Sequence, residues 1–141
     1  MEFDPDNPIV KLCARGMDME EQGKPEEASI LFLQAWNEST NDFEKFISAH
    51  YLARHQKSPA SKLTCDETAL QLALKMNDDT IKSSFPSLYL NIAKDYEDLN
   101  EFDKARKNYE LALSFTDFLP DDGYGKMIKD GIISGIERVT K

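Results

Sequence analysis

The sequence predicts an all-α protein in which helical hairpins stack side by side. Two distant stretches carry one series of small and large residues, separated by identical steps of 4, 3, 4, 5, 4 and 3 residues. We call this series the ladder. The first copy is Leu12, Gly16, Met19, Gly23, Ala28, Phe32 and Ala35, and the second is Tyr89, Ala93, Tyr96, Asn100, Ala105, Tyr109 and Ala112. Nearly all glycines and prolines fall where turns are expected, and no strand is evident in the sequence. Such a repeat predicts repeated supersecondary units.

The ladder has a direct structural interpretation. Two antiparallel helices joined by three or four residues must approach closely, and small residues such as Gly16 and Ala28 allow that approach. Large residues such as Phe32 and Tyr109 fill the space between hairpins. Each hairpin leaves one apolar face open, so it needs a neighbour to bury that face. We therefore expect Ala28 and its counterpart Ala105 to be buried where two helices meet.

Local signals place the first hairpin near the N-terminal end. The Asn7-Pro8 pair is a cap followed by a first-turn proline, and it predicts a helix that runs until Gly23 ends it. Pro25 begins the second helix, where two glutamates in the first turn suit the positive end of the helix dipole. Apolar residues cover more than one side of this helix. We therefore expect its Trp36 to be largely buried between hairpins.

The middle hairpin is predicted from weaker signals. A third helix is expected from about Asp42 to His55, and residues 57–62 should form a turn. The segment Thr64–Glu67 fits a capping box, which predicts that a fourth helix begins there and continues through Met76.

The third hairpin has one ambiguous boundary. The fifth helix begins either at about Thr80, with Pro86 as a kink, or with Pro86 in its first turn. It should end near Leu99, and a tight turn then leads to a sixth helix over residues 103–115.

A seventh helix is expected over about residues 124–139, and we expect it to cover the open apolar face of the third hairpin. Gly131 and Gly135 lie four residues apart on it, which predicts close packing against Leu113 or Phe115. Its apolar stripe consists of Ile128, Ile132, Ile136 and Val139.

The ladder resembles the pattern of the tetratricopeptide repeat (TPR) family. The resemblance implies a superhelix of three helical hairpins plus a C-terminal capping helix, within one domain of residues 1–141. The repeats would cover approximately residues 9–40, 42–79 and 86–117, and the capping helix approximately residues 122–140.

The middle repeat departs from the family pattern. His50 lies 34 residues after Gly16, in the place of a small residue, and Ala73 would match Ala35 if the preceding turn is longer. The segments ISAHYLARHQ and PSLYLNIAKDYEDL make the whole chain similar to small stand-alone bacterial members of the family, which implies no known chemistry.

Charge and cysteine content exclude several classes of protein. The net charge is −9, and residues 1–41 carry nine acids and three bases, so nucleic acid is not an expected ligand. No apolar stretch approaches the roughly 20 residues that span a bilayer, and the acidic N-terminus is unlike a signal peptide. Cys13 and Cys65 lack the spacing of a metal site or disulfide framework. We therefore expect a cytoplasmic protein that does not bind membranes.

The TPR resemblance also implies a binding groove, because the first helix of each pair lines the concave face in this family. Apolar walls with a few polar groups are typical of a peptide groove. Cys13 and Met17 replace the lysine and asparagine with which some members bind a C-terminal carboxylate, so that binding mode is not expected. The mapped residues are Val10, Cys13, Met17, Glu20, Ile47, Ser48, Tyr51, Arg54, His55, Leu90, Asn91, Lys94 and Asp98.

The sequence therefore favours a non-catalytic scaffold or adaptor that binds a protein or peptide on its concave face. The first alternative is a self-associating module that forms homodimers, and the second is an enzyme or metal-binding protein. His50 and His55 lie about 140° apart on a helix and cannot easily share a metal. The sequence also lacks a glycine-rich phosphate loop, an HExxH motif and a nucleophile elbow. We expect no catalytic residue, metal or cofactor.

Overall fold

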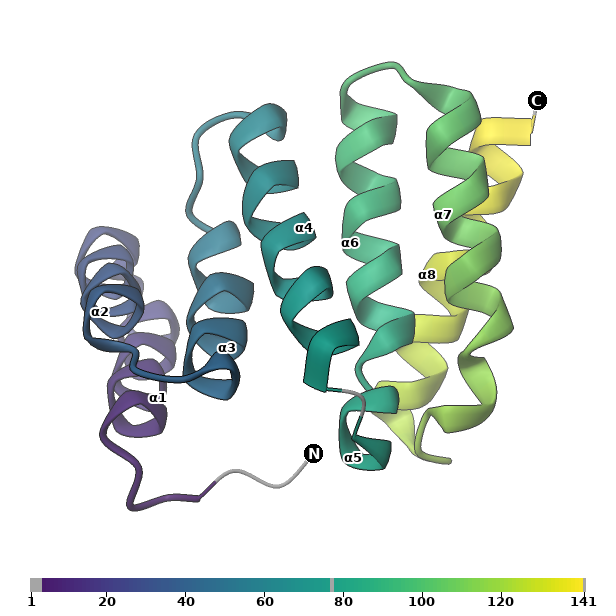
Figure 1. The fold of residues 1–141 in the computed structure, drawn as a ribbon. Coiled ribbons are helices and arrows are strands. Elements are labelled where there is room, and N and C mark those ends of the chain that lie inside the picture. Colours follow the sequence, from purple (N-terminus) through teal and green to yellow (C-terminus); the bar gives the residue numbers. More distant parts are fainter. Residues whose placement is uncertain (1–3, 77, 141) are drawn as a thin grey trace. The chain divides into compact units, whose positions relative to one another are not determined.

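The computed structural model describes residues 4–76 and 78–140, and all regular structure in these ranges is helical (Figure 1). The predicted all-α class is confirmed. The chain divides into two compact units, Glu2–Met76 and Asn77–Lys141, each with helices packed around apolar side chains. The assignment of residues 1–141 to one domain stays a prediction.

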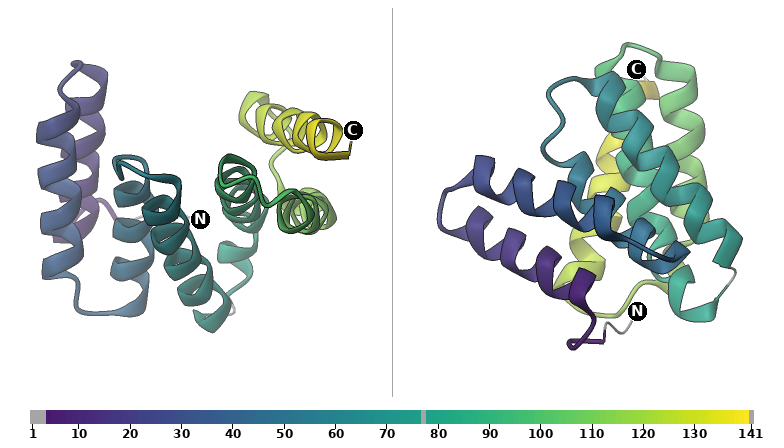
Figure 2. Two further views of the ribbon diagram at one scale, coloured as in Figure 1. Left: turned by 90° about the horizontal axis from the view of Figure 1, so that it is seen from above. Right: turned by 60° about the vertical axis from the view of Figure 1, so that its left-hand side comes forward.

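The N-terminal unit consists of two helical hairpins. Helices α1 and α2 form the first, α3 and α4 form the second, and α3 also packs against both α2 and α1. Both views of Figure 2 show α1 and α2 side by side. The bounds are Pro8–Glu21 for α1, Pro25–Glu38 for α2, Asp42–Ala53 for α3 and Pro59–Met76 for α4.

The C-terminal unit consists of a third hairpin covered by the last helix. Helices α6 and α7 form the hairpin, and α8 lies across both of them (Figure 1). The three predicted hairpins and the final helix are therefore present. The bounds are Asp79–Lys82 for α5, Phe85–Asp98 for α6, Phe102–Ser114 for α7, Thr116–Phe118 for the short 3₁₀ helix η1 and Gly123–Thr140 for α8.

The two copies of the ladder form the same turn. Gly23 has a φ of 72° and Asn100 a φ of 62°, so each hairpin has a left-handed residue directly after the C-cap of its first helix. In both turns the next residue donates its backbone N–H to the carbonyl oxygen five residues earlier, which is the pattern of a Schellman cap. These bonds join Lys24 to Met19 at 2.8 Å and Glu101 to Tyr96 at 2.9 Å.

A substitution pair tests this turn. Gly23→Ala is expected to destabilise the N-terminal unit by about 1 kcal/mol, because a β-carbon makes the left-handed conformation unfavourable. Gly23→Asn should cost less, since the second copy of the ladder uses Asn100 at the same place. Urea unfolding followed by circular dichroism measures both variants. Equal losses for alanine and asparagine would contradict the left-handed assignment.

The small and large positions of the ladder pack as predicted. Ala28 and Ala105 are fully buried, and so are the aromatic residues Phe32 and Tyr109 one turn later. Gly16 permits close approach of the two helices in the first hairpin, because a β-carbon there would overlap the Phe32 ring.

The start of the fourth helix was predicted wrongly. Helix α4 begins at Pro59, and Thr64 lies inside it, where its hydroxyl donates to the Ala60 carbonyl oxygen at 3.1 Å. The Ser58 hydroxyl accepts the backbone N–H of Ser61 at 3.1 Å and satisfies the first turn. Ser58-Pro59 therefore starts the helix in the same way as Asn7-Pro8.

The ambiguous region before α6 contains two separate helices. Asp78 caps the short α5 by accepting the Thr80 N–H at 2.9 Å, and α6 then begins at Phe85 with Pro86 in its first turn. The kinked-helix alternative is wrong. Trp36 has intermediate exposure where α2 packs against α3, with the Lys45 ammonium 5.7 Å from its ring centroid.

A polar cluster holds α8 against the third hairpin. The buried Tyr109 hydroxyl donates to Glu97 Oε1 at 2.6 Å, and the Arg138 Nε donates to Glu97 Oε2 at 2.9 Å. The Arg138 guanidinium lowers the pKa of Glu97, while burial and the Glu97 carboxylate raise the pKa of Tyr109. The Glu97 carboxylate therefore stays ionised, and it links α6 to Arg138 of α8, which is distant in sequence.

Candidate functional site

Three of the residues mapped to the groove are buried in the N-terminal unit. Ser48 is fully buried, and its hydroxyl donates to the Glu44 carbonyl oxygen at 2.9 Å. Cys13 and Ile47 are each 2% exposed. Burial raises the pKa of the Cys13 thiol to about 12, so the reactive thiolate is not formed near neutral pH. In this structure none of these three side chains is accessible to a ligand.

Other mapped residues of the N-terminal unit form the surface where α1 meets α3. Val10, Met17 and Tyr51 are partly exposed. The Tyr51 ring stacks on Phe32 with 5.4 Å between centroids, and the Arg54 guanidinium carbon lies 4.8 Å from the Tyr51 centroid.

Glu20 connects this surface to the end of α3. Its Oε1 accepts a hydrogen bond from Arg54 Nη1 at 2.9 Å, and its Oε2 lies 2.8 Å from His55 Nε2. The His55 ring also stacks on Phe32, with centroids 5.5 Å apart. Arg54 and His55 therefore hold α3 against α1, which occupies much of their capacity to bind a ligand.

The mapped residues of the C-terminal unit have different environments. Leu90 packs beneath α8, where a β-carbon at Gly131 would lie 3.6 Å from its Cδ2. Lys94 pairs with Asp98 at 2.8 Å, and Asn91 is partly exposed. Helix α8 therefore covers the apolar part of the surface that was mapped here.

His50 lies on α3, at the place where the TPR resemblance implied a small residue. Its Nδ1 is buried and has no hydrogen-bond partner among the described residues. The ring makes an edge contact with Tyr51, with centroids 5.3 Å apart. Burial, aided by the Arg54 guanidinium, lowers the pKa of His50 to about 4.

This histidine predicts a loss of stability in mild acid. The unfolded chain takes up a proton at His50 below pH 6.5, whereas the folded chain resists protonation until about pH 4. Its contribution is present above pH 6.5, and about 2 kcal/mol should be lost by pH 5. Urea unfolding at pH 7 and pH 5 measures the difference. His50→Ala, which restores a small residue, should lose less, and an equal loss would contradict the assignment.

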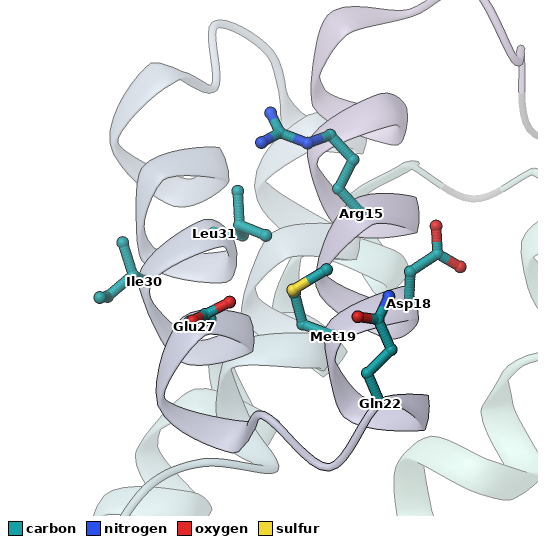
Figure 3. Close-up of a pocket in the computed structure, with 7 residues that line it drawn as sticks. All are labelled: Arg15, Asp18, Met19, Gln22, Glu27, Ile30 and Leu31. Atoms are coloured by element: carbon teal, nitrogen blue, oxygen red, sulfur yellow. The ribbon is translucent and has the colours of Figure 1, made fainter.

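A second surface, which was not predicted from the sequence, lies on the first hairpin. A hollow of about 310 Å³ opens between α1 and α2. Figure 3 shows Met19 between the two helices and Arg15 and Gln22 toward opposite ends. The lining residues are Arg15, Asp18, Met19, Gln22, Glu27, Ile30 and Leu31.

The charged groups of this hollow are not used by the fold. Arg15, Asp18 and Glu27 make no ion pair within residues 4–76 and 78–140. Ile30 at the edge is 66% exposed, and Leu33, less than one turn further along α2, is 47% exposed. The surface combines apolar side chains with charges of both signs that have no ion-pair partner among the described residues.

The ladder provides an internal comparison for this surface. Counting from Ala28 and Ala105, Ile30 corresponds to Lys107 and Leu33 to Glu110, and all four side chains are exposed. The third hairpin therefore forms with charged residues at these two places. Ile30 and Leu33 are therefore not required for the hairpin to form. The alignment of the two ladder copies is therefore the sequence feature from which this surface could have been predicted.

The described residues form helical hairpins, with a hollow between α1 and α2. No group of three or more His, Cys, Asp and Glu side chains able to hold a metal occurs in the described ranges. No helix in the same part of the chain is long and apolar enough to cross a membrane. No protein-family model matches the chain, and no curated protein or solved structure shows significant similarity to it.

Proposed function

We propose that this protein is a non-catalytic, TPR-like adaptor that binds another protein or a peptide in the cytoplasm. The observation that carries the proposal is the outer surface of the first hairpin, which we call the α1/α2 face. It consists of the hollow together with Ile30 and Leu33. Two strongly exposed apolar residues stand there where the equivalent hairpin has Lys107 and Glu110. Exposed apolar surface that folding does not require is typical of interaction sites.

The concave face implied by the TPR resemblance is a second candidate surface. Met17 and Tyr51 are partly exposed there, but Arg54 and His55 are engaged by Glu20. Homodimer formation through exposed apolar residues is the alternative function.

Photocrosslinking tests the proposal. A photoreactive benzoylphenylalanine replaces Ile30 in one variant and Lys107 in a matched control, and both are expressed and irradiated in the native host. We expect a discrete heteromeric product at position 30 and none at position 107. Absence of any product at position 30 would refute binding through the α1/α2 face. A product containing two copies of this chain would establish the homodimer alternative.

A further inference from the structure

We infer that the occupant of the α1/α2 face is a short basic amphipathic segment of another protein, with an apolar anchor in the hollow and Lys or Arg side chains beside it. This inference rests on the proposed function and adds the chemistry of the partner. It is carried by the shape of the hollow, its unpaired charges and the size of the exposed apolar patch.

The hollow is suited to an apolar anchor. Its volume of about 310 Å³ is at the lower end of the range for ligand pockets. Met19 lies between α1 and α2, opposite Leu31 (Figure 3). Methionine is flexible and polarisable, so it adapts to aliphatic side chains of different shape. Exposed Ile30 extends this apolar surface at the edge.

The charges around the hollow favour a basic partner. The hairpin Pro8–Glu38 carries six acids and three bases, and only Glu20 among these acids is neutralised by a described ion pair from outside the hairpin. Asp18 and Glu27 line the hollow without an ion-pair partner among the described residues. Lys or Arg side chains beside the anchor would form charge-assisted contacts with them.

Arg15 gives the predicted complex a direction. It is the one basic residue that lines the hollow, and it lies toward the end away from the α1–α2 turn (Figure 3). A basic residue of the partner would be repelled there. The partner's basic residues should therefore lie nearer Glu27, at the turn end.

A second copy of this chain fits the surface less well. Each copy would bring a net charge of −9 and the same acidic hairpin to the interface. A stable interface buries about 800 Å² on each partner. The α1/α2 face offers two largely exposed apolar side chains, Ile30 and Leu33, which cover only part of that area.

The test uses three fluorescein-labelled helical peptides of 14 residues. The first has leucines on one face and lysines on the other, the second replaces the lysines with glutamates, and the third replaces the leucines with alanines. Fluorescence anisotropy with the full chain should show the leucine–lysine peptide binding at least tenfold more tightly than either of the others. Comparable binding of the glutamate peptide would overturn the basic-partner inference, and position-30 crosslinking would still report separately on the proposed function.

Two variants identify where the peptide binds. Ile30→Lys combined with Leu33→Glu copies the third hairpin and leaves the net charge at −9, so general charge attraction is unchanged. We expect this variant to weaken binding of the leucine–lysine peptide at least tenfold. Asp18→Asn combined with Glu27→Gln should weaken it several-fold and reduce its salt dependence. Unchanged affinity in the first variant would show that binding occurs elsewhere and would overturn the site.

Sedimentation velocity tests whether a second copy of this chain occupies the α1/α2 face. We expect the unmodified chain to be monomeric at micromolar concentration. A dimer that dissociates in the Ile30→Lys, Leu33→Glu variant would show that a second copy occupies the face and would overturn the inference.

Discussion

Ending the chain after Pro120 is expected to unfold the C-terminal unit. The truncation removes Ile128 and Ile132, which are buried against α6 and α7, and each buried isoleucine contributes about 1.5–3 kcal/mol. It also removes Arg138, the partner of Glu97. A unit of roughly 40 residues would remain, near the lower limit for independent folding. Circular dichroism melting and gel filtration should show lost helix with aggregation or a new dimer.

Two neighbouring isoleucines provide the control for this prediction. Ile132 is fully buried and Ile133 is 41% exposed, although both lie on α8. Ile132→Ala should cost about 2–5 kcal/mol, whereas Ile133→Ala should cost much less. A truncated chain that stays monomeric and equally stable would refute the covering role of α8. It would also leave α8 available for self-association.

Much of the fold follows from chemistry that acts over a few residues. The ladder predicted two hairpins with the same turn because Gly23 and Asn100 both tolerate a left-handed conformation. It also predicted the burial of Ala28 and Ala105, since only small residues permit close approach at those places.

Competing local signals explain the misplaced boundary of α4. Thr64–Glu67 and Ser58-Pro59 are both good helix starts, and a helix can contain a threonine whose hydroxyl bonds back to a carbonyl. The sequence does not rank the two starts, because their difference depends on how α4 packs against α3.

Side-chain partners distant in sequence were not predictable in the same way. Glu20 meets Arg54 34 residues later, and that contact requires the packing of α3 against α1. Glu97 holds the same place in the second copy of the ladder and meets Arg138 of α8. The equivalence of the two glutamates was visible in the register, but their partners depend on the helix that packs against each hairpin, α3 for Glu20 and α8 for Glu97.

The apolar patch on α2 was also present in the sequence, as Ile30 and Leu33. Apolar residues on several sides of that helix were interpreted as burial between neighbours. In the structure α2 packs against α1 and α3, and these two side chains remain exposed. Helical periodicity identifies apolar positions, but it does not show which of several apolar sides receives a neighbour.

The contact of the last helix with α7 gives the second prediction of large effect. Gly135 faces the Tyr109 ring, and a β-carbon there would lie 2.3 Å from Tyr109 Cε1. The predicted close packing of this helix is therefore present, but its partner is Tyr109 rather than Leu113 or Phe115. Tyr109 is fully buried and its hydroxyl is bonded to Glu97, so the ring cannot move away without breaking that bond. Gly135→Ala should therefore destabilise the C-terminal unit by about 1–3 kcal/mol.

Gly131 on the same helix provides a matched control for the Gly135→Ala prediction. A β-carbon at Gly131 would meet Leu90 Cδ2 at 3.6 Å, which is an ordinary contact distance. Alanine is a better helix former than glycine, so Gly131→Ala should stabilise the unit by about 0.5–1 kcal/mol. Thermal and urea unfolding of the two variants should therefore show shifts of opposite sign. If Gly135→Ala were also stabilising, α8 could not lie against Tyr109 at the distance described, and the helix would have to cover the third hairpin in a different register.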